Sequence, residues 1–542
     1  MNRRNFLKSI GLYTAAISPV ARIGGSLGLA GGTTAFANAT GGYKALVILD
    51  MDGGNDTMNM FPPTKASTHS TYKKIRTSLG VNLKNLSKNK FYKKDEAGHF
   101  TGSLGANQPY FVEEGKHGTE VGKEAMYLNG YYDTKADLGI HGLMPEIASL
   151  YEKGVLSIVS NTGVLIEPTT KAQIDNGTAN LPEFLFSHGN QRELIATLQA
   201  GQISSKSGWA GRLADTWNIN GDLGLNISYG GSTKLFLGKK TSALTMRTLA
   251  PAQYSSEGTN VSKGKEHTMD KFEDLLQNVS ENTQTTNIFD KFTNKRNKDT
   301  SILSRKLGIA WTKAPTFSSK NSYGDPLFKV YTGNGTTRKN LGIRTHHGLD
   351  KRIFEQLEAT AKMIKVSKDE MSAQKQIFYV RQAGYDLHAS QVDTHSKLLR
   401  AISLGVSDFY KALEEMGLEK DVLVISSSEF GRTMRNNGDG TDHGWGGHSF
   451  MVCGDPTFNG GQVLGKVMKD VSFEGKNAYT NRARMIPTTS IEQMMAPALK
   501  WFGVDDVTMN NVLPNLKNFK TAKNESGYLK GVFGETVSTA FA

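Results

Sequence analysis

The sequence of 542 residues contains a single cysteine, Cys453, and only 14 prolines. One cysteine excludes an intrachain disulfide, so the stability of the fold has to come from core burial or from bound metal. The small number of prolines argues against an extended proline-rich linker. Beyond the N-terminal segment, no apolar run approaches the roughly 18–20 residues that a membrane-spanning helix needs. We therefore expect a mature protein without a membrane span.

Acidic residues are also absent from the first 39 residues, which begin with Arg3-Arg4 in a charged stretch. A mildly apolar middle and small-residue cleavage patterns within residues 35–39 follow, as in export signals. The arginine pair and its surroundings are similar to a twin-arginine signal. We expect the twin-arginine export machinery to recognise residues 1–39, which leaves residues 40–542 as one periplasmic or secreted domain. An ordinary secretory signal and a retained anchor are the alternatives.

The chain has a formal net charge of +13, and removal of the four basic residues in the export segment would lower it by four, to +9. Lysine and arginine are spread along the chain and do not follow one helix face with interleaved aromatics. This distribution does not indicate a specific nucleic-acid partner. A surface that binds acidic polymers such as sulfated glycans is a weaker hypothesis, and screening would make that binding salt-dependent.

Short apolar runs alternate with helical patterns along the chain. Five of these runs are typical of buried strands: residues 45–49, 155–159, 377–380, 422–425 and 449–452. Alternation of fully apolar strands with helices predicts an α/β fold with a mostly parallel sheet and helices on both faces.

Two helices are marked most clearly by their spacing. Apolar residues recur at three- and four-residue steps over 396–416, and Gly417 follows as a C-terminal cap. A second pattern covers about 490–502, where Thr489 and Glu492 predict a capping box. The stretches 64–130 and 253–345 are rich in Lys, Asn, Thr and Ser. We interpret them as polar surface insertions in the single domain.

Ligands of such sheets bind beyond the carboxyl ends of the strands, which directs attention to the loops that follow each strand. Asp56 follows the first strand in a loop that contains Gly53-Gly54. Its carboxylate could hold a cation or simply form an Asx-type turn. Asp386 and His388 follow the strand at 377–380 and are two residues apart. In extended backbone they point the same way and could share one metal ion.

The richest loop reads SSSEFGRTMRNNGDGTDHGWGGH and follows the strand at 422–425. Glu429 lies at the strand end, and Asp442-His443 are bracketed by glycines. Carboxylate and imidazole ligands suit zinc or manganese, and several of them could build a two-metal site. The competing interpretation makes Glu429 the ion-pair partner of Arg432 and His448 a packed core histidine.

A fourth stretch, LFSHGNQRELIATLQAG at 185–201, places Ser187 at the start of an expected helix. Backbone N–H groups at a helix N-terminus can stabilise an oxyanion or a phosphate, so Ser187 is a candidate nucleophile. The commoner role of serine at such a position is N-capping.

Taken together, several stretches resemble an exported bacterial family known as domain of unknown function 1501, which groups with the alkaline phosphatase and sulfatase superfamily. The matching stretches are residues 53–63, 140–171, 185–191, 207–215, 384–388, 428–454 and 486–519. The resemblance implies an alkaline phosphatase-like α/β sandwich that binds one or two metals beside a nucleophile. It implies metal ligands at Asp56, Asp386, His388, Asp442 and His443, then His448 and Glu429, with Ser187 as the nucleophile.

The resemblance implies an exported metal-dependent hydrolase of small-molecule or polymeric phosphate or sulfate esters. Its cofactor would be a divalent metal, zinc or manganese first, with magnesium and calcium as alternatives. Many relatives read SHNDQ where this chain has Gly189 and Asn190, so a carboxylate is missing beside Ser187. The alternative is therefore a catalytically degenerate exported binding or assembly protein on the same scaffold.

Overall fold

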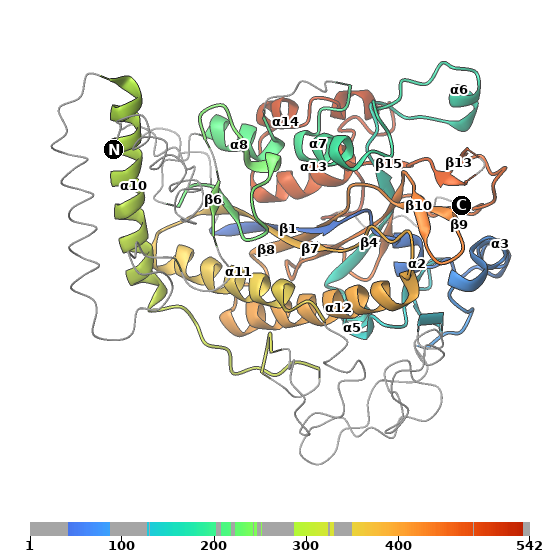
Figure 1. Cartoon of the computed structure of the whole chain (residues 1–542), viewed down its shortest axis with the longest axis horizontal. Helices are drawn as coiled ribbons and strands as arrows, with labels where there is room; N and C mark the ends of the chain where they lie inside the picture. Colours follow the sequence, from blue (N-terminus) through green and yellow to red (C-terminus); the bar gives the residue numbers. More distant parts are fainter. Residues whose placement is uncertain are drawn as a thin grey trace, which may run out of the picture.

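The computed structural model describes most of the chain beyond the expected export segment (Figure 1). The described residues are 42–86, 127–128, 130–201, 207–217, 223–241, 243–246, 251, 287–322, 326–329, 349–480 and 482–534. The predicted export signal at 1–39 lies outside them, as do parts of both predicted insertions.

A nine-stranded sheet forms the centre of the molecule, in the order β12-β4-β11-β8-β1-β7-β5-β6, with β15 paired to β4. Its strands are β1 (Lys44–Asp52), β4 (Leu156–Gly163), β5 (Asn226–Ser228), β6 (Leu244–Thr245), β7 (Lys375–Ala383), β8 (Val422–Ser427), β11 (Gly447–Val452), β12 (Val463–Leu464) and β15 (Thr489–Ser490). Strand β1 runs parallel to both β7 and β8. Only β11 runs antiparallel to its neighbours, β4 and β8. The prediction of a mostly parallel sheet is confirmed.

Helices cover both faces of this sheet (Figure 1). One face carries α5 (Pro145–Glu152), α11 (Lys351–Glu370) and α12 (Gln391–Met416), and the other carries α7 (His188–Thr197), α8 (Trp209–Trp217), α13 (Ile491–Phe502) and α14 (Asp506–Val512). Alternation along β1 explains the two layers, because successive side chains of a strand point to opposite faces. Val47 belongs to the core cluster with α11 and α12, whereas Ile48 belongs to the one with α13.

Smaller elements complete the described part of the fold. They are the helices α2 (Thr57–Met60), α3 (Ala66–Arg76), α6 (Lys171–Asp175) and α10 (Ile288–Trp311), the 3-10 turns η3 (Thr77–Leu79), η4 (Lys234–Phe236) and η6 (Leu516–Phe519), and the short strands β2 (Tyr131–Asp133), β3 (Gly139–His141), β9 (Arg432–Asn436), β10 (Thr441–His443), β13 (Ala478–Tyr479) and β14 (Arg484–Met485). None of the helices in the described residues is both long and apolar enough to cross a bilayer.

The two helices expected from spacing are present, with one correction. Helix α12 ends at Gly417, whose φ of 65° is the left-handed conformation that favours glycine at this position. Helix α13 has its capping box at Ser490 and Gln493, so the predicted box was wrong by one residue. Thr489 begins the preceding strand β15, and the Glu492 side chain is buried instead of capping the helix.

The segment at 64–130, interpreted as a surface insertion, packs into the molecule over its described N-terminal part. Tyr72 and Ile75 of α3 join a core cluster with Met434 and Met485, and Arg76 is fully buried. The amphipathic face of α3 is short and mixed with lysines, which is why its composition suggested a surface. In the other insertion, α10 buries Leu303 and Leu307 against the core.

Candidate metal centre

The loops that follow β1 and β7 meet strand β10 at one end of the sheet, and Arg432 joins all three. Its fully buried guanidinium donates to the carbonyl oxygen of Gly54 at 2.6 Å and to those of Thr441 and Tyr385 at 3.0 Å each. It also donates to Asp386 Oδ1 at 2.6 Å. The loops approach too closely for a side chain at Gly53, where an added Cβ would lie 2.4 Å from the backbone nitrogen of Asp386. Arg432 therefore fixes the position of Asp386.

His188, Asp386 and His443 come together at this end, from three distant parts of the sequence. The Nε2 atoms of His188 and His443 are 3.0 Å apart. Asp386 Oδ2 lies 3.3 Å from His188 Nε2, and Asp386 Oδ1 lies 3.3 Å from His443 Nε2. Two imidazole nitrogens and a carboxylate therefore face one small volume, which is the donor set that zinc and related ions bind.

His388 and Asp442 extend this group on one side. The Nε2 atom of His388 lies 2.9 Å from His443 Nε2 and 3.1 Å from Asp386 Oδ1. Its Nδ1 atom lies 3.3 Å from Asp442 Oδ1, and the other oxygen of Asp442 is paired with Arg482. Of the residues predicted as ligands, the structure thus gathers Asp386, His388, Asp442 and His443 in one place.

The second nitrogen of each imidazole faces an oxygen acceptor. His188 Nδ1 lies 2.6 Å from Glu429 Oε1, and His443 Nδ1 lies 2.7 Å from the Phe186 carbonyl oxygen. With His388 Nδ1 beside Asp442, each Nδ1–H can donate to its acceptor, which leaves the lone pair on Nε2. Three such lone pairs and a carboxylate at about 3 Å repel one another unless a cation lies among them. A metal ion fits this arrangement.

Burial and charge favour the protonation states that bind metal. Burial lowers the pKa of His443; the Phe186 carbonyl partly offsets this, and the charge of Arg432 lowers it further. Burial alone would raise the pKa of Asp386, but the hydrogen bond and charge of Arg432 outweigh it and lower the pKa. Neutral imidazole and ionised carboxylate are the forms that act as ligands. The Asp386 side chain is 46% exposed, so solvent and small ligands can reach the group.

Glu429 lies behind this group and not within it. Its side chain is 1% exposed, and Oε2 accepts a hydrogen bond of 2.9 Å from the Gly53 backbone N–H. Oε1 faces His188 Nδ1, as carboxylates do when they orient a metal-binding histidine. Phe430 packs against the rings of both His188 and His443, with centroids 4.9 and 4.7 Å apart. Together they hold the two imidazoles in place.

Ser187, the predicted nucleophile, is the exposed N-cap residue of α7, directly before His188. Its side chain makes no capping hydrogen bond. The turn that precedes it is unusual, because Phe184 and Phe186 both have positive φ, 50° and 73°. This costly conformation turns the Phe186 carbonyl toward His443. The loop therefore contributes a hydrogen-bond acceptor, the Phe186 carbonyl oxygen, to His443.

Asp56 lies elsewhere, in a buried ion pair. Asp56 Oδ1 accepts a hydrogen bond of 2.9 Å from Arg76 Nη2, and Oδ2 is bound by Arg76 Nη1 and by Gln391 Nε2, the latter at 2.6 Å. Burial would raise its pKa, but Arg76 outweighs this and lowers it. The structure does not place Asp56 in the group formed by His188, Asp386 and His443.

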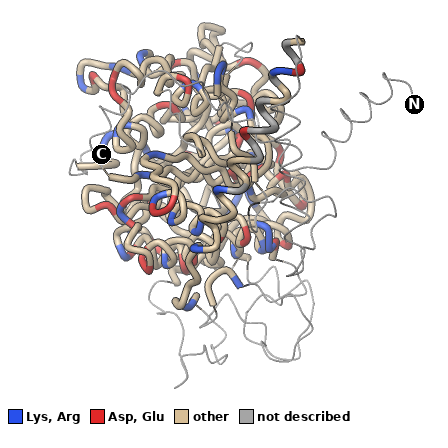
Figure 2. Tube along the Cα trace, turned by 90° about the vertical axis from the view of Figure 1, so that its left-hand side faces the viewer, with Lys and Arg blue, Asp and Glu red and all other residues tan. Residues whose placement is uncertain are grey.

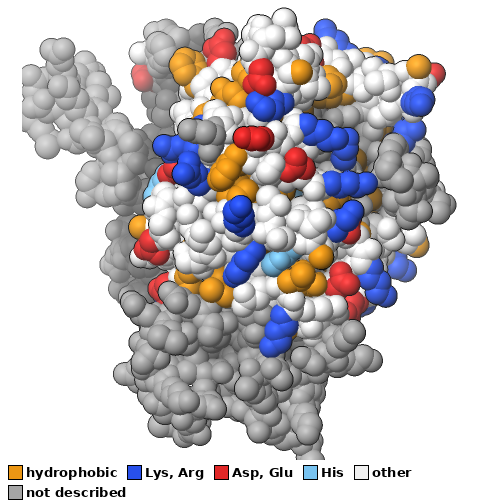
Figure 3. Space-filling view, turned by 90° about the vertical axis from the view of Figure 1, so that its right-hand side faces the viewer, with side chains coloured by type: hydrophobic (Ala, Val, Ile, Leu, Met, Phe, Trp, Pro, Cys, Tyr) orange, Lys and Arg blue, Asp and Glu red, His pale blue; other side chains and the backbone are white. Residues whose placement is uncertain are grey.

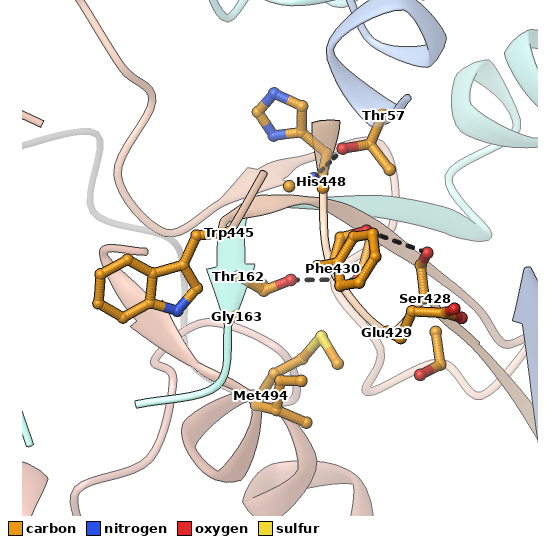
Figure 4. Close-up of a pocket in the computed structure, with 14 residues that line it drawn as sticks. Thr57, Thr162, Gly163, Ser428, Glu429, Phe430, Trp445, His448 and Met494 are labelled. Atoms are coloured by element: carbon orange, nitrogen blue, oxygen red, sulfur yellow. Dashed lines mark hydrogen bonds between the residues drawn. The ribbon is translucent and has the colours of Figure 1, made fainter. Parts of the chain in front are cut away.

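His448 is buried in strand β11. Its Nδ1 accepts a 3.1 Å hydrogen bond from the Asn161 backbone, and burial lowers its pKa to about 4. It lines a cavity of about 20 Å³ together with Ser428 and Glu429, which Figure 4 shows beside Trp445. That volume holds about one water molecule. The structure thus does not place His448 in the group formed by His188, Asp386 and His443.

His188 is the candidate ligand that sequence reasoning missed. Attention to the Ser187-His188 pair went to the hydroxyl, although an imidazole at the start of a helix is as well placed for ligation. The position of His188 at the start of an expected helix could have identified it as a candidate ligand. The Phe186 carbonyl gave no signal, because its role depends on a backbone conformation that composition does not reveal.

Comparison with known proteins gives a partial match. Residues 356–511 match the model of a family described as "Protein of unknown function (DUF1501)", which confirms the family resemblance over this part of the chain. The matched range includes Asp386 and His443 but not Ser187, His188 or Asp56. No curated protein matches the chain.

Solved structures with distant similarity include one whose title concerns the metabolism of glycosaminoglycans by Bacteroides thetaiotaomicron. It is 10% identical, covers 88% of this chain and 74% of that chain, and has a TM-score of 0.32. A second is a 2-O GAG sulfatase that is 11% identical, covers 70% of this chain and 71% of that chain, and has a TM-score of 0.26.

Proposed function

We propose that this chain is an exported metal-dependent hydrolase of phosphate or sulfate esters, with zinc or manganese held by His188, Asp386 and His443. One observation carries the proposal. The Nε2 atoms of His188 and His443 lie 3.0 Å apart and face Asp386, while the Nδ1 atom of each ring faces an acceptor. His388 adjoins the same atoms and supplies a further ligand on the side of Asp442.

A bound metal of this kind supplies positive charge for the ester oxygens and activates a hydroxyl or a water for attack. The residues around the centre orient the ligands and set their protonation states. Glu429 and the Phe186 carbonyl fix the tautomers of His188 and His443, and Arg432 holds the Asp386 carboxylate ionised. Ser187 remains the candidate nucleophile, since it is exposed at the N-terminus of α7 beside His188. Backbone N–H groups there can also hold an anionic group.

Metal analysis of the purified protein tests the centre. Wild-type protein should retain or take up about one or two equivalents of zinc or manganese, and His443→Ala should lose most of this binding. Asp506→Asn is the control, because Asp506 is an exposed carboxylate paired with Lys500 of α13, whose neighbour Trp501 contacts the start of β1, at the end of that strand remote from the metal centre. Absence of bound metal, together with no thermal shift on metal addition, would refute the metal centre.

Turnover tests the reaction. A panel of aryl phosphate and aryl sulfate esters should be hydrolysed in a metal-dependent way, and Ser187→Ala should reduce the rate if Ser187 is the nucleophile. Metal binding without turnover of either ester class would favour the alternative, an exported binding or assembly protein on this scaffold. Asn190 is the observation behind that alternative, because the family resemblance implies a carboxylate at this position.

The export route is part of the same proposal. We infer that the twin-arginine machinery carries the folded chain to the periplasm or the cell exterior, on the basis of the Arg3-Arg4 segment. Replacement of both arginines by lysine should retain the protein in the cytoplasm, as fractionation would show. Continued export of that variant would contradict the route while leaving the metal centre untouched.

A further inference from the structure

We propose that Arg482 and Arg484 form an anion-binding subsite beside the metal centre, which takes a second anionic group of the substrate. Arg484 begins β14, which pairs with β13. It lies next to His443, the last residue of β10. Its Nε donates to the His443 carbonyl oxygen at 2.7 Å. The guanidinium also lies over the Phe186 ring, 4.1 Å from the ring centroid.

These contacts place Arg484 at the wall of the metal centre. Phe186 and His443 are the two residues that hydrogen-bond to each other there, and Arg484 touches both. The Phe186 ring is in turn stacked on Tyr479 of β13, with centroids 5.9 Å apart and the planes at 24°. Arg484 is thus held rigidly, so a ligand that binds it needs little further ordering of the side chain.

The charge of this arginine pair is only partly balanced within the described residues. Arg482 is paired with Asp442, which also faces His388 at 3.3 Å. The hydrogen-bond acceptors of Arg484 are the His443 carbonyl and, at 3.3 Å, the Thr480 hydroxyl, and both are neutral. Two guanidinium groups therefore share one carboxylate, and a bound anion would supply the missing countercharge. Guanidinium binds carboxylate, sulfate and phosphate oxygens in paired hydrogen bonds.

A second arginine pair on the other side of the centre shows the contrast. Arg192 Nη2 lies 2.6 Å from Asp52 Oδ1 and 3.2 Å from Glu429 Oε1, and Arg381 is paired with Asp52 as well. Two carboxylates thus match these two guanidiniums. The positive charge available to a ligand is on the side of Arg482 and Arg484.

The surface view in Figure 3 agrees with this direction of approach. It shows the end of the molecule that faces right in Figure 1, where basic side chains are more prominent than acidic ones. Along the trace of the described residues as a whole, Figure 2 shows basic and acidic positions interspersed. A substrate with more than one negative charge would meet a favourable field at the end that carries β10 and β13.

This inference rests on the proposed function for the identity of the reacting ester, and it narrows the substrate class. The substrate would carry a phosphate or sulfate ester for the metal centre and a second anionic group for the arginine pair. That second group could be a carboxylate, a sulfate or a phosphate, since a guanidinium recognises the oxygen pairs common to all three.

Binding of matched, non-hydrolysable probes tests the subsite. Phenylphosphonate carries one anionic group, and its carboxyphenyl, sulfophenyl and bisphosphonate counterparts carry two. Calorimetry on the metal-loaded mature chain at fixed ionic strength should show about tenfold tighter binding of at least one of the three counterparts. The counterpart that gains most identifies the second group.

Arg484→Gln should remove most of that gain, which is measured as the ratio of two-anion to one-anion affinity within the same variant. Arg482→Gln should remove part of the gain. Lys500→Gln deletes an exposed charge on α13, away from the metal centre, and should retain the gain. Arg484→Lys, which keeps the charge, should restore part of the gain. Equal weakening of all probes by Arg484→Gln would overturn the proposal, as would a wild-type protein without preference for any two-anion probe.

The proposed function and the subsite can fail separately. If metal analysis is negative, the hydrolase proposal fails, but an Arg484-dependent preference for two-anion probes would still be measurable in the metal-free protein. If metal binds and esters are hydrolysed without any such preference, only the subsite is refuted. Thermal melting of each variant separates loss of binding from loss of folding.

Discussion

Asp56 and Asp386 follow neighbouring strands of the same sheet and face an arginine each, yet their surroundings differ completely. The Asp56 side chain is 1% exposed, and Arg76 occupies both of its oxygens. The Asp386 side chain is 46% exposed; Arg432 and the imidazoles of His388 and His443 approach Oδ1, and the His188 imidazole faces Oδ2. A carboxylate enclosed by a guanidinium supports the fold. One that keeps an open side toward histidines can bind a ligand.

The energetic reason lies in desolvation. A buried ion pair offsets the cost of removing two charges from water only while both partners are present. For Asp386 that cost is smaller because solvent reaches it, and its charge remains available to a cation. The resemblance implies that both residues are metal ligands, and the structure supports this more directly for Asp386.

The same Asp→Asn substitution should affect different properties at the two positions: stability at Asp56 and metal affinity at Asp386. Asp56→Asn leaves the Arg76 charge buried and unpaired, so it should lower the free energy of unfolding by about 3–5 kcal/mol. Asp386→Asn keeps an acceptor for Arg432, so it should change stability far less but weaken metal binding by on the order of 100-fold, because a charged ligand is lost. Urea unfolding and metal titration of both variants give the two readouts.

A double variant provides the control for this prediction. Asp56→Leu combined with Arg76→Met replaces the buried pair by apolar side chains and should recover much of the lost stability. If Asp56→Asn remained as stable as the wild type and lost its metal, Asp56 would be a ligand after all.

Glu429 offers the next test, since it orients a ligand without being placed to bind the metal itself. Glu429→Gln weakens the hydrogen bond that fixes the tautomer of His188, so metal affinity should fall by about 10–100-fold. Glu193→Gln is the matched control on α7, where Glu193 pairs with Lys234 away from the centre. Metal titration with a competing chelator measures both. An unchanged affinity in Glu429→Gln would remove Glu429 from the centre.

Much of the fold could be predicted from the sequence because it depends on local patterns. Apolar runs marked β1, β7 and β8, and the D-x-H spacing placed Asp386 and His388 in one group. The pairing of Asp56 with Arg76 could not be predicted in this way. It joins a strand-end loop to a helix inside a segment whose lysines and threonines suggested a surface, and only the tertiary packing of α3 buries that arginine.

The role of His188 shows a second limit. Its distance from His443 depends on the turn at Phe184 and Phe186, whose positive φ values no apolar or polar pattern reveals. Local composition therefore identifies candidate ligands, while their convergence is decided by a few buried groups that join the loops. Arg432, which binds the loops after β1 and β7 and the start of β10, is the clearest of these groups.

Asp408 is a third carboxylate, buried like Asp56, and it differs from Asp56 and Asp386 in its partners. Within the described residues, no guanidinium lies at hydrogen-bond distance from it. It accepts one hydrogen bond of 2.9 Å from the Phe328 backbone, and burial raises its pKa to about 8. In the unfolded chain its pKa is about 4. Between these values the folded state binds more protons than the unfolded state, so this residue makes stability fall as pH rises from about 4 to 8.

Asp408→Asn removes that titration and keeps an acceptor for the Phe328 N–H. We expect wild type and variant to differ little in stability at pH 5, because burial favours the protonated form of Asp408. At pH 8.5 the variant should be more stable than the wild type by about 1 kcal/mol or more, since the wild type then has to bury a charge or hold a proton against the solution pH. Urea unfolding of both proteins at the two pH values measures the change. A gap that stays constant with pH would show that burial alone does not set the protonation of this carboxylate, and would weaken the same argument for Asp56 and Asp386.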